Sequence, residues 1–383
     1  MKREKILILS GNYGEGHQQA ARAISEAIQL RHFELEPVIQ DYMEIAHPLV
    51  YPLSRSLFNQ GVKKFPSIYR YFYRRTHSGH VLPSLLRKLN YIGIKRMYEM
   101  IHELRPRVVV NTFPLAAGAV SVLKELGLTN IPSVTIITDY TEHNSWIHPH
   151  TNHYIVGSET VGQNLKHLGI SDANISVTGI PIRPAFGMSY RSTALMQKYN
   201  INPCVPTLLM MGGGWGIMGD GIESFLALDQ LPQPVQLIIV CGNNHRLKKQ
   251  LDKALKYSKH RVLITGHVNY IHELMAISDI LITKPGGLTV SEAIAMELPM
   301  LLYKPLLGQE QDNARLLLEL GVALQTENTA DMLTKLSEML ADPQRLALMR
   351  NHAKKINQKH AVFDALDVIL QNVSDEETQA NEA

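Results

Sequence analysis

Short apolar runs alternate, along the first half of the chain, with stretches in which apolar residues recur every three or four positions. The runs have the length and the Val/Ile/Leu content of buried strands, whereas stretches such as 16–30 and 114–126 have the period of amphipathic helices. The expected strands are KILIL (5–9), LEPVIQ (35–40), RVVVN (107–111), SVTIIT (133–138) and HYIVG (153–157). Strands that alternate with helices in this way predict βαβ units and a parallel sheet.

The same pattern starts again after the segment VTGIPIRPAF (177–186), whose prolines and glycine are typical of a connection between domains. The strands expected there are TLLMM (207–211), VQLIIV (235–240), RVLIT (261–265), DILIT (279–283) and PMLLY (299–303). We therefore expect an α/β protein of two Rossmann-like domains that face a cleft. Ligands of such folds bind outside the carboxyl ends of the strands.

These patterns also give the expected boundaries. The first domain covers 1–183 and the second covers 184–350. A helix over 351–371 is expected to pack back on the first domain. The tail over 372–383 is acidic and has no apolar pattern, so we expect it to be disordered. A length of 383 residues fits two domains of ordinary size.

Composition narrows the class of protein. A hydrophobic content of 45% with 19% charged residues is typical of a globular chain, and a net charge of +3 is too small to indicate nucleic-acid binding. The two cysteines form neither a disulfide framework nor a metal-ligand spacing, which indicates a reducing compartment. The first apolar run is only ILIL, and no stretch approaches the ~18 apolar residues that span a bilayer. We therefore expect a protein of the cytoplasm, or one that lies peripherally on the cytoplasmic face of the cell membrane.

The first strand leads into a glycine-rich loop, GNYGEGH (11–17), that ends in His17. Its glycines follow the order G-x-x-G-x-G, which is not the G-x-G-x-x-G of dinucleotide-binding loops. Gly14 and Gly16 are interpreted as residues that let an acceptor molecule approach the backbone, with His17 presented to the reacting hydroxyl.

A second glycine loop follows TLLMM and contains a literal G-x-G-x-x-G over 214–219. A dinucleotide site also needs an acidic residue after the next strand, but VQLIIV ends in Cys-Gly-Asn-Asn, which argues against an oxidoreductase. Bare backbone after a strand can instead hold phosphate oxygens, which makes Gly213 and Gly214 candidate donor-binding residues. A purely structural turn is the alternative.

The most specific stretch covers 278–314 and holds two strand–loop–helix units in succession. In the first, Lys284, Gly286 and Gly287 precede a helix that carries Thr289, an arrangement that favours anion binding through free backbone N–H groups and the helix dipole. Glu292 stands one turn further, where its carboxylate could accept hydrogen bonds from a ribose diol. The second unit offers amide and carboxylate groups that suit sugar hydroxyls, although some of them could simply cap helices. These residues are Gln309, Glu310 and Asn313.

This stretch resembles the donor site of the inverting GT-B glycosyltransferases that include the peptidoglycan lipid-intermediate N-acetylglucosaminyltransferase and the glycolipid synthases. The chain is most similar to processive diacylglycerol β-glucosyltransferases and monogalactosyldiacylglycerol synthases, over nearly its whole length, through ILSGNYGEGH, NTFP, TDYTEHNSWIHP, MGGGWG, KPGG and GQEQDNA. The resemblance implies that the glycine-rich turn and Thr289 bind the diphosphate and that Glu292 binds ribose. It also implies that the GQE…NA segment faces the donor sugar and that TGHV, with Val268, presents backbone to uracil.

A basic and aromatic stretch extends from Arg55 to Tyr98, with ten Lys/Arg, eight aromatic residues and no Asp or Glu. Aromatics at headgroup depth beside cations describe a segment at a membrane interface. A solvated helical face and RNA binding are the alternatives. The residues expected to bind a membrane are Phe65, Tyr69, Arg70, Phe72, Tyr73, Arg74 and Arg75.

Sugar transfer also needs a base and a way to stabilise the leaving diphosphate. His17 is the expected base, because an unperturbed imidazole has a pKa of about 6.5; Asp139 is the rival, either as base or as the residue that orients His17. His143 and Trp146 follow Asp139 and are expected to bind the acceptor. No D-x-D pair occurs, so we expect no metal and no other cofactor, with loop amides and Lys284 or Arg183 in the metal's place.

We therefore expect an inverting transferase that moves a hexose, glucose first, from UDP-glucose or UDP-galactose to diacylglycerol or a glycosyl-diacylglycerol. Its partners would be these substrates and an anionic membrane surface, without nucleic acid. Transfer to an undecaprenyl-linked or soluble acceptor, epimerisation of a UDP-sugar, and a non-catalytic sensor of UDP-sugars are the alternatives. The choice of hexose, the processivity, the oligomeric state and the choice between His17 and Asp139 stay open.

Overall fold

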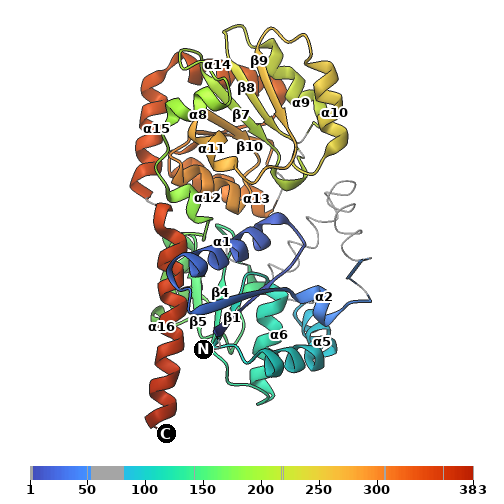
Figure 1. Cartoon of the computed structure of the whole chain (residues 1–383), viewed down its shortest axis with the longest axis vertical. Helices are drawn as coiled ribbons and strands as arrows, with labels where there is room; N and C mark the ends of the chain where they lie inside the picture. Colours follow the sequence, from blue (N-terminus) through green and yellow to red (C-terminus); the bar gives the residue numbers. More distant parts are fainter. Residues whose placement is uncertain are drawn as a thin grey trace. The chain divides into compact units, whose positions relative to one another are not determined.

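The computed structural model shows two compact units, each built around one parallel sheet (Figure 1). Unit 1 comprises Met1–Pro184 together with His360–Ala383, and unit 2 comprises Ala185–Lys359. The residues that the structure describes are 3–49, 51–52, 82–141, 143–216, 218, 220–305, 308–356 and 358–382.

The sheet of unit 1 has the strand order β2-β1-β3-β4-β5-β6 within the described residues, with all neighbours parallel. Its strands are β1 (Glu4–Ser10), β2 (Leu35–Asp41), β3 (Val108–Asn111), β4 (Ser133–Ile136), β5 (His153–Val156) and β6 (Ile175–Val177). The apolar run of β1 is buried on both faces. Ile6 and Ile8 belong to one core cluster, and Leu7 and Leu9 belong to the other. The continuous apolar run in the sequence therefore reflects a sheet covered on both sides.

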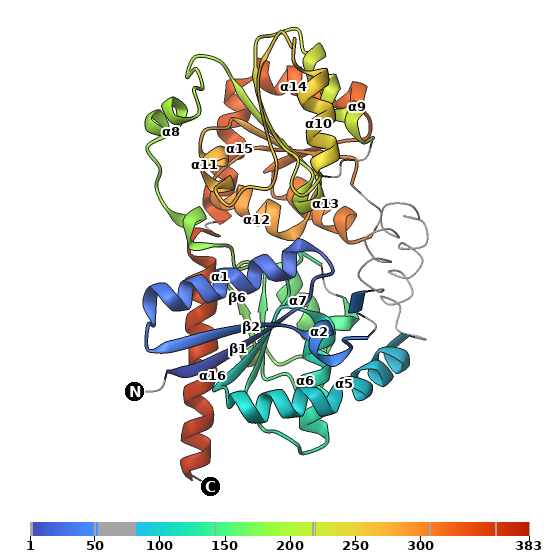
Figure 2. The same cartoon turned by 45° about the vertical axis from the view of Figure 1, so that its right-hand side comes forward.

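Helices supply both covers in unit 1. One face packs against α1 (Glu15–Arg31) and α16 (Ala361–Glu382), whose buried side chains share a cluster with Ile6 and Ile8. The other face packs against α2 (Tyr42–Ala46), α5 (Leu82–Leu104) and α6 (Pro114–Glu125). The last helix of the first half is α7 (Glu159–His167). Both views show α16 beside the sheet of unit 1 (Figure 2).

The described strands of unit 2 form a parallel sheet of order β12-β11-β10-β7-β8-β9. They are β7 (Thr207–Met211), β8 (Gln236–Val240), β9 (Arg261–Thr265), β10 (Ile280–Thr283), β11 (Met300–Tyr303) and β12 (Ala323–Thr326). The helices are α8 (Ser192–Lys198), α9 (Ile222–Leu226), α10 (His245–Ala254), α11 (Ile271–Ala276), α12 (Gly287–Ala295), α13 (Gln309–Glu319), α14 (Thr329–Ala341) and α15 (Pro343–Ile356).

Each sheet reverses its strand order at one point. In unit 1 the chain proceeds from β1 outward to β2 and then returns to β3 on the other side of β1. In unit 2 it proceeds from β7 to β8 and β9 and then returns to β10. Loops diverge at such a reversal and leave room for a ligand at the carboxyl ends of the two strands. The expected α/β fold of two Rossmann-like domains is confirmed, and the reversals locate the candidate site in each.

The carboxyl-terminal end differs from the expected helix over 351–371 and disordered tail over 372–383. Two helices are present, because the turn Gln358–His360 separates α15 from α16, and unit 2 extends to Lys359 rather than to residue 350. The helix α16 continues to Glu382. The tail SDEETQANE contains neither Gly nor Pro, and three of its nine residues are Glu, so a helix already anchored on unit 1 can propagate through it.

Candidate active site

His17 lies at the carboxyl end of the unit 1 sheet, in the first turn of α1 rather than in the preceding loop. Gly14 caps this helix at φ +123°, a conformation that side-chain-bearing residues rarely adopt, and a Cβ there would meet nothing within 4 Å. Gly11 has a different reason, because a Cβ would lie 2.7 Å from the ring of Phe113. Gly16 is the second residue of α1. The unusual glycine order thus reflects one backbone conformation and one close contact.

Three elements surround the imidazole of His17. Its Nδ1 lies 3.0 Å from Oγ1 of Thr138, which follows β4. Its ring packs edge-on against Phe113, at 5.3 Å between centroids, and against Trp146, at 5.8 Å. The sequence prediction missed Thr138 and Phe113. Both stand just beyond the end of a strand, and Phe113 is in the NTFP motif, so their positions carried a usable signal.

Burial lowers the pKa of His17 to about 4, and a hydrogen bond to the Thr112 backbone opposes this shift only in part. The expectation of an ordinary imidazole with a pKa of about 6.5 is therefore wrong. Burial disfavours the charged form, so His17 is neutral near pH 7. A neutral imidazole can accept a proton, although its basicity is lower than that of a solvated histidine.

The rival base and the two expected acceptor residues follow β4. Asp139 is buried, at 8% exposure, and is adjacent in sequence to Thr138. His143 caps a short 3-10 turn, because its Nδ1 accepts a hydrogen bond from the Ser145 backbone at 3.1 Å. That turn delivers Trp146, which is only 3% exposed and packs on His17. Trp146 therefore forms part of the wall around His17, and His143 caps the turn that carries it.

In unit 2, the loops after β7, β8 and β9 approach one another backbone to backbone. Gly216 has φ +58°, and a Cβ there would meet the Cys241 carbonyl oxygen at 2.2 Å. Gly242 has φ +55°, and its Cβ would meet the Gly214 carbonyl oxygen at 2.3 Å. The N–H of Asn243 donates to the same Gly214 oxygen at 2.8 Å. Glycine is required here by both conformation and contact, so several of the glycines fix the loop rather than open it.

The loops at the β7/β10 reversal meet at Lys284. A Cβ on Gly213 would lie 3.6 Å from Cε of Lys284, and the Lys284 ammonium pairs with the Glu310 carboxylate at 2.9 Å. Asn313, fully buried in α13, donates from its side-chain amide to the Pro285 carbonyl at 3.0 Å. The structure thus brings together the predicted donor residues of the glycine loop, KPGG and GQE…NA. Two of them, Glu310 and Asn313, have structural partners.

The amino terminus of α12 follows the loop that contains Lys284. Gly286 is its N-cap, and no side chain caps the helix. The first N–H groups of a helix, here those of Gly287 and the next two residues, have no acceptor within the helix. Thr289 is half-buried in this first turn, and Glu292 is buried one turn further on, at 8% exposure. Uncapped N–H groups and a helix dipole form a site that attracts anions.

The remaining predicted donor residues lie at neighbouring loops. Gln309 is the first residue of α13, whose N-cap Gly308 has φ +110°. Val268 is half-buried in the loop after β9. Arg183, considered as a charge for the leaving group, pairs with Glu26 of α1 at 2.8 Å. Figure 2 shows α12 and α13 adjacent to each other below the unit 2 sheet.

Three further predictions concern membrane contact and metal binding. The seven residues expected to bind a membrane, in the range 65–75, lie outside the described residues. Among the described residues, no three His, Cys, Asp or Glu side chains gather as metal ligands would. No helix in the described ranges combines the length and the apolarity that crossing a bilayer requires.

Comparison with known proteins identifies the family. The family model for monogalactosyldiacylglycerol (MGDG) synthase matches residues 17–182, and that for glycosyl transferases group 1 matches residues 222–356. Processive diacylglycerol beta-glucosyltransferases of Bacillus pumilus and Bacillus subtilis are each 33% identical to the chain. The alignments cover 96% and 97% of the chain and 95% and 94% of the two relatives.

Solved structures establish the fold. MurG of Acinetobacter baumannii superposes with a TM-score of 0.64 at 14% identity, over 97% of this chain and all of that one. The UDP-GlcNAc 2-epimerase of Neisseria meningitidis, bound to UDP-GlcNAc, gives 0.62 at 16% identity, over 96% of this chain and all of that one. The chain is therefore a glycosyltransferase of the GT-B fold and belongs to the family of the processive diacylglycerol beta-glucosyltransferases.

Proposed function

We propose that this protein transfers a glucosyl unit from UDP-glucose to diacylglycerol or to a glycosyl-diacylglycerol, with inversion at the anomeric carbon. The relatives at 33% identity are named for this acceptor and this sugar, and they align over almost the whole chain. The observation that carries the proposal is the uncapped α12 amino terminus beside Lys284, at the reversal of the unit 2 sheet.

The donor diphosphate occupies that amino terminus in the proposal. The free N–H groups of the first turn donate to the phosphate oxygens, and the Thr289 hydroxyl adds a further donor. Lys284 supplies positive charge as the leaving diphosphate gains negative charge, which is where a fixed charge lowers the barrier most. These groups take the place of a metal, so no metal or other cofactor is required. Glu292 accepts hydrogen bonds from ribose, and Val268 lies by the base.

The donor sugar is held by residues at the start of α13. Gln309 and Glu310 offer an amide and a carboxylate to the sugar hydroxyls, with Asn313 one turn further. Because Lys284 already contacts the Glu310 carboxylate at 2.9 Å, this ion pair links the phosphate site to the sugar site. Gly213 and Gly214 place backbone without side chains beside the donor sugar.

The chemical step moves one bond and one proton. The acceptor hydroxyl oxygen attacks the anomeric carbon, the bond from that carbon to the phosphate oxygen breaks, and UDP leaves with the bonding electrons. His17 takes the hydroxyl proton in this scheme, because it is neutral near pH 7 and fixed by Thr138. Asp139 is the alternative base. Gly14, Gly16, His143 and Trp146 line the acceptor side. Attack opposite the leaving group gives a β-glycoside from an α-linked donor.

The acceptor lies in a bilayer, so we propose a peripheral location on the cytoplasmic face of the cell membrane. Cations and aromatics of the 55–98 stretch would contact anionic headgroups there. Their expected members are Phe65, Tyr69, Arg70, Phe72, Tyr73, Arg74 and Arg75.

Incubation of the protein with diacylglycerol in mixed micelles and either UDP-glucose or UDP-galactose tests the proposal. We expect a glucosyl-diacylglycerol from UDP-glucose and a decrease of kcat by about 10²-fold or more in Lys284→Ala. His17→Ala and Asp139→Asn are compared to identify the base. The base is the residue whose variant loses turnover but still binds UDP. Lys335→Ala, in a surface ion pair of α14, is the matched control and retains full activity. Absence of glycolipid with either donor would overturn the proposed reaction.

A further inference from the structure

The outward side of α10 is mostly basic, with Asp252 as its one acidic residue. Leu247 and Leu251 bury the opposite side of the helix in the core of unit 2, and Leu255 continues that row. With 3.6 residues per turn, positions 246, 249 and 253 lie opposite these leucines, and Gln250 and Asp252 lie on the two flanks of that row. We call this surface, with the turn that follows it, the α10 face. Its exposed members are His245, Arg246, Lys249, Gln250, Lys253, Lys256 and Tyr257.

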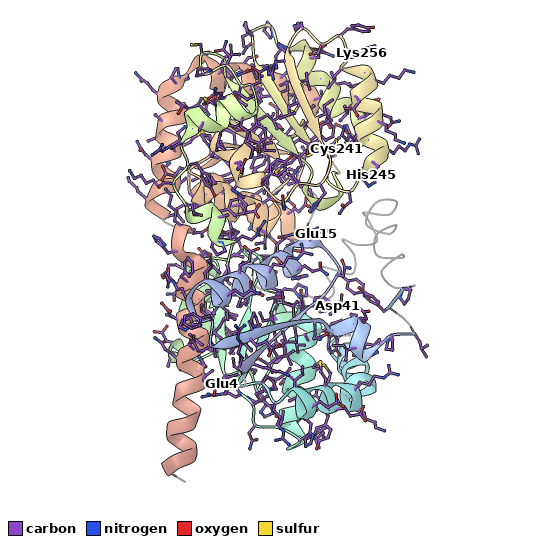
Figure 3. The ribbon with its side chains drawn as sticks, viewed as in Figure 1. Glu4, Glu15, Asp41, Cys241, His245 and Lys256 are labelled. Carbon is purple, nitrogen blue, oxygen red and sulfur yellow. The ribbon has the colours of Figure 1, made fainter. Side chains whose placement is uncertain are left out.

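The α10 face forms an open hollow of about 440 Å³. The hollow is lined by His245, Arg246, Lys249, Gln250 and Lys253. Figure 3 labels His245 and Lys256, which lie at opposite ends of the helix. Three of the five residues that line this hollow are permanent cations, namely Arg246, Lys249 and Lys253.

Arg246, Lys249 and Lys253 have no carboxylate partner among the described residues, unlike several other surface cations of unit 2. Lys198, Arg315 and Lys335 each pair with a carboxylate, at 2.5, 3.2 and 3.0 Å respectively. On α10 the one acidic residue, Asp252, is held at 2.8 Å by Lys248, at the edge of the face. Among the described residues, no carboxylate pairs with Arg246, Lys249 or Lys253, so their charge is available to an external anion.

A tyrosine extends from the end of this surface into solvent. Tyr257 is 87% exposed, and the ammonium of Lys256 lies 5.2 Å from the centre of its ring. An exposed ring costs free energy in water, whereas at headgroup depth its apolar body and its polar hydroxyl both find suitable surroundings. A lone aromatic among cations therefore fits a membrane interface better than it fits bulk solvent.

We propose that the α10 face binds the anionic headgroups of a bilayer, which gives unit 2 a membrane contact of its own. The choice of a bilayer over nucleic acid rests on the proposed function, because the proposed acceptor lies there. The side chains that line the hollow hold lipid phosphates, and Tyr257 enters the headgroup layer. The contact concerns donor-binding unit 2 and is independent of the 55–98 stretch in unit 1.

The test measures how the full chain sediments with vesicles, without any sugar donor. We compare vesicles of phosphatidylcholine with phosphatidylglycerol and vesicles of phosphatidylcholine alone. A basic residue near an anionic surface contributes about a fivefold change in partitioning. The triple variant Arg246→Gln/Lys249→Gln/Lys253→Gln is therefore expected to bind the anionic vesicles ~100-fold more weakly. Tyr257→Ser should weaken binding by a smaller factor, and added salt should weaken wild-type binding.

The matched control removes the same charge elsewhere on unit 2, in Lys198→Gln/Arg315→Gln/Lys335→Gln. It should retain wild-type vesicle binding. Equal losses in both triple variants, or no loss in the α10 variant, would overturn the proposal. So would an α10 variant that loses affinity for single-stranded RNA or inorganic phosphate but keeps its affinity for vesicles. In mixed micelles with UDP-glucose the α10 variant should keep wild-type turnover. A protein inactive in micelles therefore contradicts the proposed reaction, whereas vesicle binding alone decides the membrane contact.

Discussion

At the scale of single residues, the Thr138 hydroxyl can hydrogen-bond to Nδ1 of His17 in either tautomer, because it can both donate and accept. With the imidazole proton on Nδ1, the Thr138 oxygen accepts it across 3.0 Å, and Nε2 presents its lone pair. With the proton on Nε2, the hydroxyl donates instead and the outer nitrogen cannot act as a base. Only the first tautomer serves the proposed proton transfer, and in that scheme Thr138 is a positioning residue because its contact with Nδ1 fixes the ring.

Removal of this hydroxyl should reduce turnover without loss of donor binding. Thr138→Val keeps the shape of the side chain but loses a hydrogen bond worth about 1 kcal/mol, so we expect a decrease of kcat by roughly 5- to 10-fold. Thr138→Ser restores the hydroxyl and most of the rate. Calorimetric UDP binding should be unchanged in both. If valine and serine behave alike, the hydroxyl does not position the base, and Asp139 becomes the stronger candidate.

The depressed pKa of His17 predicts how the stability of the protein depends on pH. An unfolded histidine has a pKa of about 6.5, and burial lowers that of folded His17 to about 4. Between these values the unfolded chain binds a proton that the folded chain excludes, so the free energy of unfolding decreases as the pH falls from about 6.5 to about 4. The loss attributable to His17 is at most about 3 kcal/mol.

Urea unfolding at a series of pH values measures this dependence. His17→Gln should flatten the curve between about pH 6.5 and 4. The pKa of His148 is also lowered by burial, so some dependence should persist in the variant. A variant whose curve is as steep as that of the wild type would show that His17 does not carry the expected shift.

Gly242 offers a test of the backbone contact that holds the β7 loop. In Gly242→Ala the new Cβ would meet the Gly214 carbonyl oxygen at 2.3 Å, and the alanine would have to adopt the φ of +55° that glycine has there. We expect a loss of stability of about 1–3 kcal/mol and weaker UDP binding, because the loop must move. Gly127→Ala, which also has a positive φ but open space around it, isolates the conformational cost. UDP titration of both variants separates the effect of the contact with Gly214 from the effect of the positive φ.

At the residue scale, the sequence was a better guide to which residues lie at the site than to the chemical state of each one. Glycine order and strand position were enough to select His17, Lys284 and Gly286. The environment of His17 could not be predicted, because its pKa depends on Phe113 and Trp146, which come from distant parts of the chain. A pattern in sequence cannot reveal desolvation by neighbours that only the tertiary fold supplies.

At the scale of elements, α16 completes the core of unit 1 from the far end of the chain. Four of its residues are almost fully buried beside α1 and the sheet: Val362, Ala365, Leu366 and Ile369. Leu366→Ala should lower the free energy of unfolding of unit 1 by about 2–5 kcal/mol, the usual range for a buried leucine. Asp367→Ala, on the exposed side of the same turn, should change it by no more than about 0.5 kcal/mol.

Tryptophan fluorescence can report this change on unit 1 alone. The chain contains two tryptophans, Trp146 in unit 1 and Trp215 in unit 2, so a Trp215→Phe background leaves only the reporter beside His17. Urea unfolding of both variants in this background gives the comparison. An equally small effect of Leu366→Ala and Asp367→Ala would mean that α16 adds little to the stability of unit 1.

The elements that the sequence predicted are those with a strong apolar pattern. All ten expected strands are present, whereas β6 and β12, which are short and sit at the ends of their sheets, were missed. An edge strand such as Ala323–Thr326 is only partly buried, so its sequence ALQT lacks an apolar run. The tail was predicted to be disordered from its charge, but its helix propensity and its attachment to α16 decide otherwise.

At the scale of the whole molecule, the two units share a plan and differ in their ligand chemistry. Each sheet gathers its motif loops where the strand order reverses, at β1/β3 and at β7/β10. Unit 1 places a buried, neutral imidazole there, and unit 2 places an uncapped helix terminus and a lysine. The repeated alternation of strands and helices predicted this division, because a plan used twice leaves the same pattern twice in the sequence.

This difference between the two units predicts which backbone amides UDP should protect from hydrogen exchange. In the free protein the amides of Gly287, Leu288 and Thr289 have no acceptor within α12, so they should exchange hydrogen rapidly. Bound diphosphate provides acceptors for them, and at a UDP concentration of 100 times Kd the bound state is stabilised by about 2.7 kcal/mol. We therefore expect their exchange to slow by up to about 100-fold.

The first turn of α14 is the internal control, because the Asn328 side chain already caps it through the Asp331 amide. Its exchange should not respond to UDP. Uridine, which lacks the phosphates, should leave Gly287 to Thr289 unprotected, so mass-spectrometric exchange with the two ligands separates the role of the phosphates from that of the base. Protection by uridine and UDP alike, or protection confined to the β1/β3 loops of unit 1, would place the diphosphate elsewhere. Protection by UDP alone would mean that the α12 terminus binds the charge that leaves with the donor.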